Sequence, residues 1–208
     1  MFAAQDGDLE LFPFARYGAA CSNNFTFRPF PSVFEGQLPL YFTEKQNGTF
    51  NLNPEETIYT LWIGTNDIGI NTLLVGEGAP GVTVVNTTTC AVNWVKTLYE
   101  SGARNFLFQN VRLNPTTGGA YTHLAVQMLP VQKTIVYSPD SYPNRYWTAQ
   151  RNTTEWNLVM TQLVNAGNAL SRALLELLAP TLPGSHIGIV DVLLAATALH
   201  IDSIHRRL

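Results

Sequence analysis

A cluster of small polar residues directly follows an apolar stretch early in the chain. Thr57–Ile63 is uncharged and rich in β-branched and aromatic residues, which predicts a strand buried on both faces. Gly64 ends this strand, and Thr65, Asn66 and Asp67 follow in a tight loop. Open α/β sheets place their ligand sites at the carboxyl ends of strands, so this loop is a candidate site for polar chemistry. The alternative is a turn in which Asn66 and Asp67 bond only local backbone.

A second candidate is the pair Asp202 and His205 near the end of the sequence. A spacing of three residues lets a carboxylate hold the imidazole of the following turn in the tautomer that a general base requires. The alternative is a solvated polar tail, because Arg206 and Arg207 follow directly.

Four motifs resemble those of the SGNH (GDSL-type) hydrolases, and they occur along the chain in the order found in that family. YGAACSN at Tyr17–Asn23 resembles the second block of that family, and LWIGTND at Leu61–Asp67 resembles the third. PFPSV at Pro29–Val33 and DSIH at Asp202–His205 complete the series. The same order is found in fungal secreted GDSL esterases and lipases, and the resemblance extends from residue 8 to about residue 193.

The resemblance implies an ester hydrolase that works through an acyl-serine intermediate. Gly18 would donate its backbone N–H, and Asn66 its side-chain amide, to the oxyanion hole. His205 would be the general base and Asp202 its orienting partner. The implied substrates are short-chain acyl or acetyl esters of plant-wall carbohydrates or of lipids, and no cofactor or metal is implied.

The nucleophile of the family is absent from its expected place. SGNH enzymes carry it in Gly-Asp-Ser after the first strand, whereas here Leu9 follows Gly7 and Asp8. We therefore expect an N-terminally incomplete chain that lacks the first strand and has impaired catalysis, because a triad enzyme without its nucleophile loses about 10⁶ in turnover. The alternatives are a secreted non-catalytic pseudoenzyme that binds acylated glycans, and a defective gene product.

The hydrophobic pattern predicts alternating strands and helices in one domain, residues 1–208. This alternation predicts a parallel sheet with helices on its faces. With the resemblance, the expected fold is a flavodoxin-like, three-layer α/β sandwich without its first strand.

Trp62 and Trp94 are expected in the core. The predicted strands are Asp8–Ala15, Thr57–Ile63, Asn105–Val111 and His186–Leu193. The predicted helices run from about Ser32 to Tyr41, from a cap at Thr88 or Thr89 to Glu100, and from Thr153 or Thr154 to Pro180; Trp156, Val159, Leu163, Leu170, Leu174 and Leu177 form the inward stripe of the last one.

The composition of the chain argues against nucleic acid as a partner and against a membrane span. The chain has 208 residues, 13% of them charged, with a net charge of −3 and no basic cluster, which argues against nucleic acid. No apolar run is long enough to span a membrane, and we expect a monomer. The irregular segment Asn114–Arg151 is long enough to border a functional site.

The sequence also carries signs of export. Glycosylation acceptor patterns begin at Asn24, Asn47, Asn86 and Asn152, although Met1–Glu10 is no signal peptide. The two cysteines, Cys21 and Cys90, would form a disulfide in an oxidising compartment or remain buried thiols. Together with the resemblance, this predicts an extracellular protein.

Overall fold

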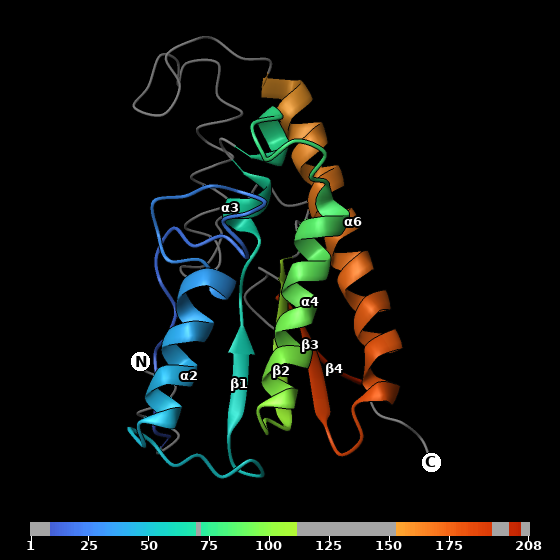
Figure 1. Ribbon diagram of the computed structural model, residues 1–208. Coiled ribbons are helices and arrows are strands. Elements are labelled where there is room, and N and C mark those ends of the chain that lie inside the picture. Colours follow the sequence, from blue (N-terminus) through green and yellow to red (C-terminus); the bar gives the residue numbers. More distant parts are fainter. Residues whose placement is uncertain (1–8, 70–71, 112–152, 193–199, 205–208) are drawn as a thin grey trace.

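The computed structural model describes residues 9–69, 72–111, 153–192 and 200–204 of the chain (Figure 1). Its helices are α2 (Leu38–Gln46), α3 (Thr65–Ile68), α4 (Val84–Glu100) and α6 (Thr153–Leu178). Shorter helical turns are η1 (Val33–Gln37), η2 (Leu73–Val75) and η4 (Ala179–Thr181). The strands are β1 (Ile58–Leu61), β2 (Asn105–Val111), β3 (His186–Val192) and β4 (His200–Ile204). The predicted long segment 114–151 lies outside the described residues.

The four strands form a single sheet in the order β1-β2-β3-β4. β1 pairs with β2 and β2 with β3 in parallel, whereas β4 pairs with β3 antiparallel. The three parallel strands confirm the predicted α/β class, because α4 and α6 lie in the connections between them. β4 was not predicted, since HIDSI offers only five residues of weak alternation.

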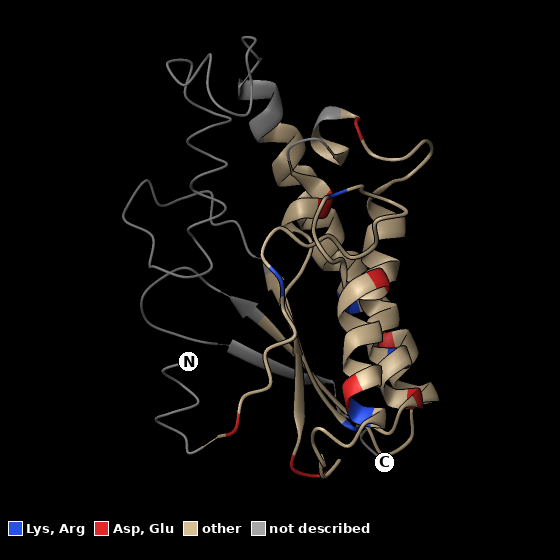
Figure 2. Ribbon diagram, turned by 60° about the vertical axis from the view of Figure 1, so that its left-hand side comes forward, with Lys and Arg blue, Asp and Glu red and all other residues tan. Residues whose placement is uncertain are grey.

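The helices α2, α4 and α6 lie on one side of the sheet (Figure 2). Tyr59 and Phe106 are register partners, so their side chains project from the same face. On that face the Tyr59 hydroxyl lies 2.8 Å from the hydroxyl of Tyr41 in α2, and the Phe106 ring contacts Trp94 of α4. The part of the chain that the structure describes therefore has two layers, a sheet and a helical layer, rather than the predicted three.

The prediction that Thr57–Ile63 is a strand buried on both faces is wrong. β1 comprises only Ile58–Leu61, and the side chain of Ile58 is 64% exposed. Trp62, expected in the core, lies beyond the end of β1 and is 43% exposed. The physical reason is that β1 is an edge strand with described helices on one side only, so an apolar run does not guarantee burial on both faces.

The strand predicted over residues 8–15 is also not found, because residues 9–15 have no strand pairing. Pro13 lacks the N–H that a strand ladder needs. Phe12 and Phe14 instead pack their rings on Phe50, a residue of the core. This stretch therefore contributes to the core through side chains rather than through backbone hydrogen bonds.

Helix α4 begins earlier than predicted. Its cap is Thr83, which forms a reciprocal capping box with Asn86, and not Thr88 or Thr89. The predicted end is confirmed, because Gly102 has a φ of 105° and donates its N–H to the oxygen of Tyr99. Trp94 is buried as expected.

Helix α6 runs over Thr153–Leu178, close to the predicted range. Its most buried side chains are Met160, Val164, Ser171 and Leu175. The predicted stripe is therefore shifted by one residue over most of its length, and Leu177 is 73% exposed. None of the helices in the described ranges is long and apolar enough to cross a membrane.

Candidate active site

The segment around Gly18 lies against α3, at the carboxyl end of β1 (Figure 1). The side-chain Nδ2 of Asn66 donates a hydrogen bond to the backbone oxygen of Ala19 at 2.9 Å. The carboxylate of the next residue, Asp67, accepts the backbone N–H of Cys21, with its two oxygens at 2.9 and 3.2 Å. Two consecutive side chains of α3 thus hold alternate residues of the same segment.

Other elements hold the segment as well. The backbone oxygens of Ala20 and Cys21 accept the N–H groups of Val33 and Phe34 at 3.0 and 3.1 Å. Cys21 is also joined to Cys90 of α4 by a disulfide, which settles the alternative that the sequence left open. The segment is therefore fixed from η1, α3 and α4 together.

Gly18 occupies a position that only glycine fits well. Its φ is +77°, in the left-handed region that side chains disfavour, and an added Cβ would lie 2.6 Å from the ring of Phe30. Gly18 is buried, and among the described residues none accepts its backbone N–H. Within the described ranges, that N–H therefore remains a candidate donor near the carboxyl end of β1.

Asn66 retains donor capacity too. A side-chain amide carries two hydrogens on its nitrogen, and the bond to Ala19 uses one of them. No second acceptor for this nitrogen lies within the described part of the chain. Arg28 approaches the same residue, with its Nη2 3.4 Å from the backbone oxygen of Asn66.

Asp67 is almost completely buried, with 1% of its surface exposed. Burial raises the pKa of the Asp67 carboxyl to about 6, and the Cys21 N–H and the positive charge of Arg28 only partly oppose this effect. The alternative that Asp67 bonds only local backbone is wrong, because its carboxylate accepts the backbone N–H of Cys21, 46 residues away.

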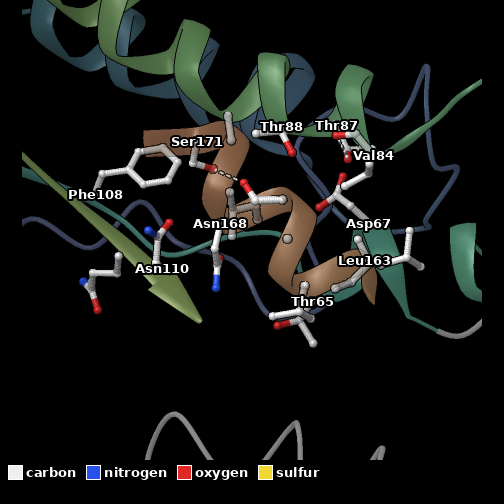
Figure 3. Close-up of a pocket in the computed structure, with 17 residues that line it drawn as sticks. Thr65, Asp67, Val84, Thr87, Thr88, Phe108, Asn110, Leu163, Asn168 and Ser171 are labelled. Atoms are coloured by element: carbon white, nitrogen blue, oxygen red, sulfur yellow. Dashed lines mark hydrogen bonds between the residues drawn. The ribbon is translucent and has the colours of Figure 1, made fainter. Parts of the chain in front are cut away.

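A pocket of about 70 Å³ lies between α3 and the helices α4 and α6. Figure 3 shows Asp67 with Thr87 and Val84 at one end of it and Phe108 with Ser171 at the other. Gly18 and Asn66 do not line this pocket. The pocket and the two candidate donors therefore do not coincide, although Asp67 both lines the pocket and bonds the segment that contains Gly18.

Glu35 organises the two motifs that surround Gly18. Its carboxylate accepts hydrogen bonds from the hydroxyl of Ser22 at 2.6 Å, from the N–H of Asn23 at 2.9 Å, and from the hydroxyl of Ser32. Partial burial would raise the pKa of Glu35, but these hydrogen bonds outweigh it and leave the pKa below its usual value. Sequence reasoning missed Glu35; the signal was a carboxylate three residues after Ser32, the spacing of a capping box.

Of the second candidate pair, the structure describes only Asp202. It lies in β4, where its backbone is opposite Ile189 of β3, and not in the turn that the sequence analysis assumed. His205 lies outside the described residues. Within those residues, no group of three His, Cys, Asp or Glu side chains is arranged to hold a metal ion.

The chain has a distant similarity to a known protein but matches no protein-family model. Over 116 residues, 52% of the chain, it is 26% identical to an acetylesterase of Hypocrea jecorina. The match spans 33% of that protein's length. The chain is thus distantly similar to a fungal acetylesterase over about half of its own length.

Proposed function

We propose that this protein is a carboxylic ester hydrolase of the SGNH type, and that the Gly18 N–H and the Asn66 side-chain amide form its oxyanion hole. The observation that carries the proposal is the Asn66–Ala19 hydrogen bond, because it brings the amide next to the residue that follows Gly18. The similarity to an acetylesterase supports the reaction class.

These donors would act on the charge that develops during acyl transfer. When a nucleophile attacks an ester, the carbonyl oxygen becomes an oxyanion, and donors already fixed in place stabilise it without reorganisation. The hydrogen bonds to residues 19–21 would hold the two donors in fixed positions in this way. Losing one such donor typically reduces turnover by about 10²–10³.

The remaining parts of the mechanism belong to the same proposal. His205 would take the proton of the nucleophile, and Asp202 would hold the imidazole in the required tautomer. Because Leu9 stands where the family carries its nucleophilic serine, turnover by this chain would be impaired. The substrates would be short acyl or acetyl esters of plant-wall carbohydrates or lipids. The Cys21–Cys90 disulfide supports an extracellular location, because disulfides persist in oxidising compartments.

A second function, ester binding without cleavage, is favoured by the serines near the donors. The hydroxyls of Ser22 and Ser32 both donate to Glu35, so neither is placed as a nucleophile. A chain with donors but no nucleophile would bind an acylated glycan and release it unchanged.

Hydrolysis of p-nitrophenyl acetate tests the proposal. Asn66→Asp keeps the shape of the side chain but replaces the donor by an acceptor, and Asn47→Ala is the control, since Asn47 is exposed at the end of α2. We expect a fall of about 10²–10³ in kcat for Asn66→Asp and none for Asn47→Ala. Equal rates in all three proteins would eliminate catalysis at this site.

The binding alternative has its own readout. Triacetin is titrated into ¹⁵N-labelled protein while the Gly18 amide and the Asn66 side-chain signals are followed. Saturable shifts without turnover would favour binding alone, whereas turnover abolished by Asn66→Asp would favour the esterase.

A further inference from the structure

Asn66 and Asp67 form hydrogen bonds to the same segment, Asn66 as the donor and Asp67 as the acceptor. Asn66 donates to the oxygen of Ala19, and Asp67 accepts the N–H of Cys21, two residues further along. In a parallel sheet, the backbone of a neighbouring strand forms hydrogen bonds to alternate residues in the same way. Here the side chains of Asn66 and Asp67 make the bonds that such a backbone would make. The spacing between Gly18 and Asn66 is thereby set from α3.

We propose that Asp67 is a positioning residue for the oxyanion donors: by holding the Cys21 N–H, it keeps the Gly18 N–H aligned with the amide of Asn66. This inference rests on the proposed function, because it assumes that these two groups are the donors. Asp67 itself contacts no reacting atom in this scheme.

A carboxylate suits this task better than an amide. It has only acceptor sites, and both oxygens lie within hydrogen-bond distance of the Cys21 nitrogen. An asparagine can turn its NH₂ group toward the Cys21 N–H, where two donors would oppose each other. Charge-assisted hydrogen bonds are also stronger than neutral ones, so the segment is held more firmly.

The chain keeps this carboxylate at a considerable cost. Asp67 is buried, and burying a charge without a full set of partners is unfavourable. Packing alone would be served as well by a neutral side chain of similar size. The Cys21 N–H and the charge of Arg28 offset part of this cost.

The protonation state of Asp67 governs the strength of that bond. Arg28, which does not line the pocket, is the cation that acts on Asp67. Apart from Asp67, the residues that line the pocket from α3, α4, α6 and β2 are neutral. Asp67 lines the pocket beside Val84 and Thr87 of α4. With a pKa of about 6, Asp67 changes charge within an experimentally accessible range.

The experiment compares the wild type, Asp67→Asn, Asp67→Ala and the control Asn47→Ala as ¹⁵N-labelled proteins. The Gly18 amide signal, the Asn66 side-chain signals and the exchange rate of the Cys21 amide are measured from pH 5 to pH 8. In the wild type we expect the Gly18 and Asn66 signals to titrate near pH 6. In Asp67→Asn we expect no titration and an altered Gly18 position.

Exchange and kinetics add two further readouts. The Cys21 amide should exchange on the order of tenfold faster or more in Asp67→Ala, with a smaller increase in Asp67→Asn. If the wild type hydrolyses p-nitrophenyl acetate, Asp67→Asn should lower kcat with little change in KM, because the donors act in the transition state. A purely structural role would lower stability without pH-dependent shifts at Gly18 and Asn66.

The two proposals fail in different ways. Absence of hydrolysis in the wild type would remove the proposed function, yet the spectra would still decide whether Asp67 positions Gly18. Gly18 and Asn66 signals that are identical in the wild type and in Asp67→Asn at both pH 5 and pH 8 would overturn the positioning role. If Asp67→Ala does not fold, Asp67→Asn alone decides.

Discussion

The side-chain nitrogen of Asn66 lies 2.9 Å from the backbone oxygen of Ala19, which joins segments 47 residues apart at the carboxyl end of β1. Neither segment is part of the sheet. Their relative position therefore depends on side chains, on the Cys21–Cys90 disulfide and on contacts from η1. Each of these contacts can be removed separately.

Gly18→Ala is expected to destabilise the protein more than Gly48→Ala. Both glycines have positive φ, 77° and 70°, so alanine carries a similar backbone strain of about 1–2 kcal/mol at either position. Only at Gly18 would the new Cβ meet the Phe30 ring, whereas at Gly48 nothing lies within 4 Å. Overpacking should add about 1–3 kcal/mol, measured by urea unfolding.

A third variant tests the cause of that difference. Phe30→Ala in the Gly18→Ala background removes the ring that the new Cβ meets. Relative to Phe30→Ala alone, Gly18→Ala should then cost about as much as Gly48→Ala. Equal losses for the two glycines in the presence of Phe30 would contradict the clash.

Removing the disulfide is expected to cost about 4 kcal/mol. Cys21 and Cys90 are 69 residues apart, and closing a loop of that length restricts the unfolded chain. The unfolding free energy of the double variant Cys21→Ser with Cys90→Ser should therefore fall well below that of the oxidised protein. Dithiothreitol should lower the stability of the wild type and leave the double variant unchanged; a wild type insensitive to reduction would count against the bond.

The sequence predicted most accurately the strands and helices whose signals lie within a few residues of one another. β2 was predicted over its full range, and α6 to within a residue or two, because a buried strand and a long helix carry strong periodicity. The α4 cap was missed, since the run of Thr87, Thr88 and Thr89 offers several caps and only the Thr83–Asn86 pair is reciprocal.

Features that depend on distant neighbours could not be predicted in the same way. The exposure of Ile58 follows from the edge position of β1, which its own sequence does not encode. The contact of Asp67 with Cys21 needs α3 to meet a segment 46 residues away, whereas Asn and Asp after a strand are also typical of a purely local turn. The resemblance of the motifs, rather than any pattern, placed Gly18 and Asn66 in one hypothesis.

Glu35→Gln is expected to destabilise the protein at neutral pH by about 1 kcal/mol, after allowance for solvent screening. The pKa of Glu35 is lowered on folding, so its stabilising contribution is present above the unfolded value of 4.5 and is lost as the pH falls through the folded value. The difference between the variant and the wild type should therefore shrink as the pH is lowered below 4.5. Thermal unfolding at pH 7, 5 and 3 measures this.

Glu44→Gln provides the matched control for that series, because Glu44 lies on the neighbouring helix α2 and its side chain receives none of the donors that converge on Glu35. It should leave the stability nearly unchanged at each pH. A loss in Glu35→Gln that is the same at pH 3 and pH 7 would contradict a role for the ionised carboxylate.

Asp67 is expected to show the opposite pH dependence. Its pKa is about 6 in the folded protein and 3.8 in the unfolded chain, so between these values the folded state binds more protons. The stability that protonated Asp67 contributes is fully present below about pH 4 and is lost as the pH rises through 6. The loss amounts to about 3 kcal/mol, because one pKa unit corresponds to about 1.4 kcal/mol.

Asp67→Asn isolates this effect, since its side chain does not titrate. The difference in unfolding free energy between wild type and variant should fall as the pH is raised from 4 to 7, and Glu55→Gln, an exposed acid, should not alter the wild-type profile. Urea unfolding at half-unit steps of pH measures the curves. Parallel profiles for the wild type and Asp67→Asn would mean that Asp67 is ionised throughout, and that Arg28 and the Cys21 N–H outweigh its burial.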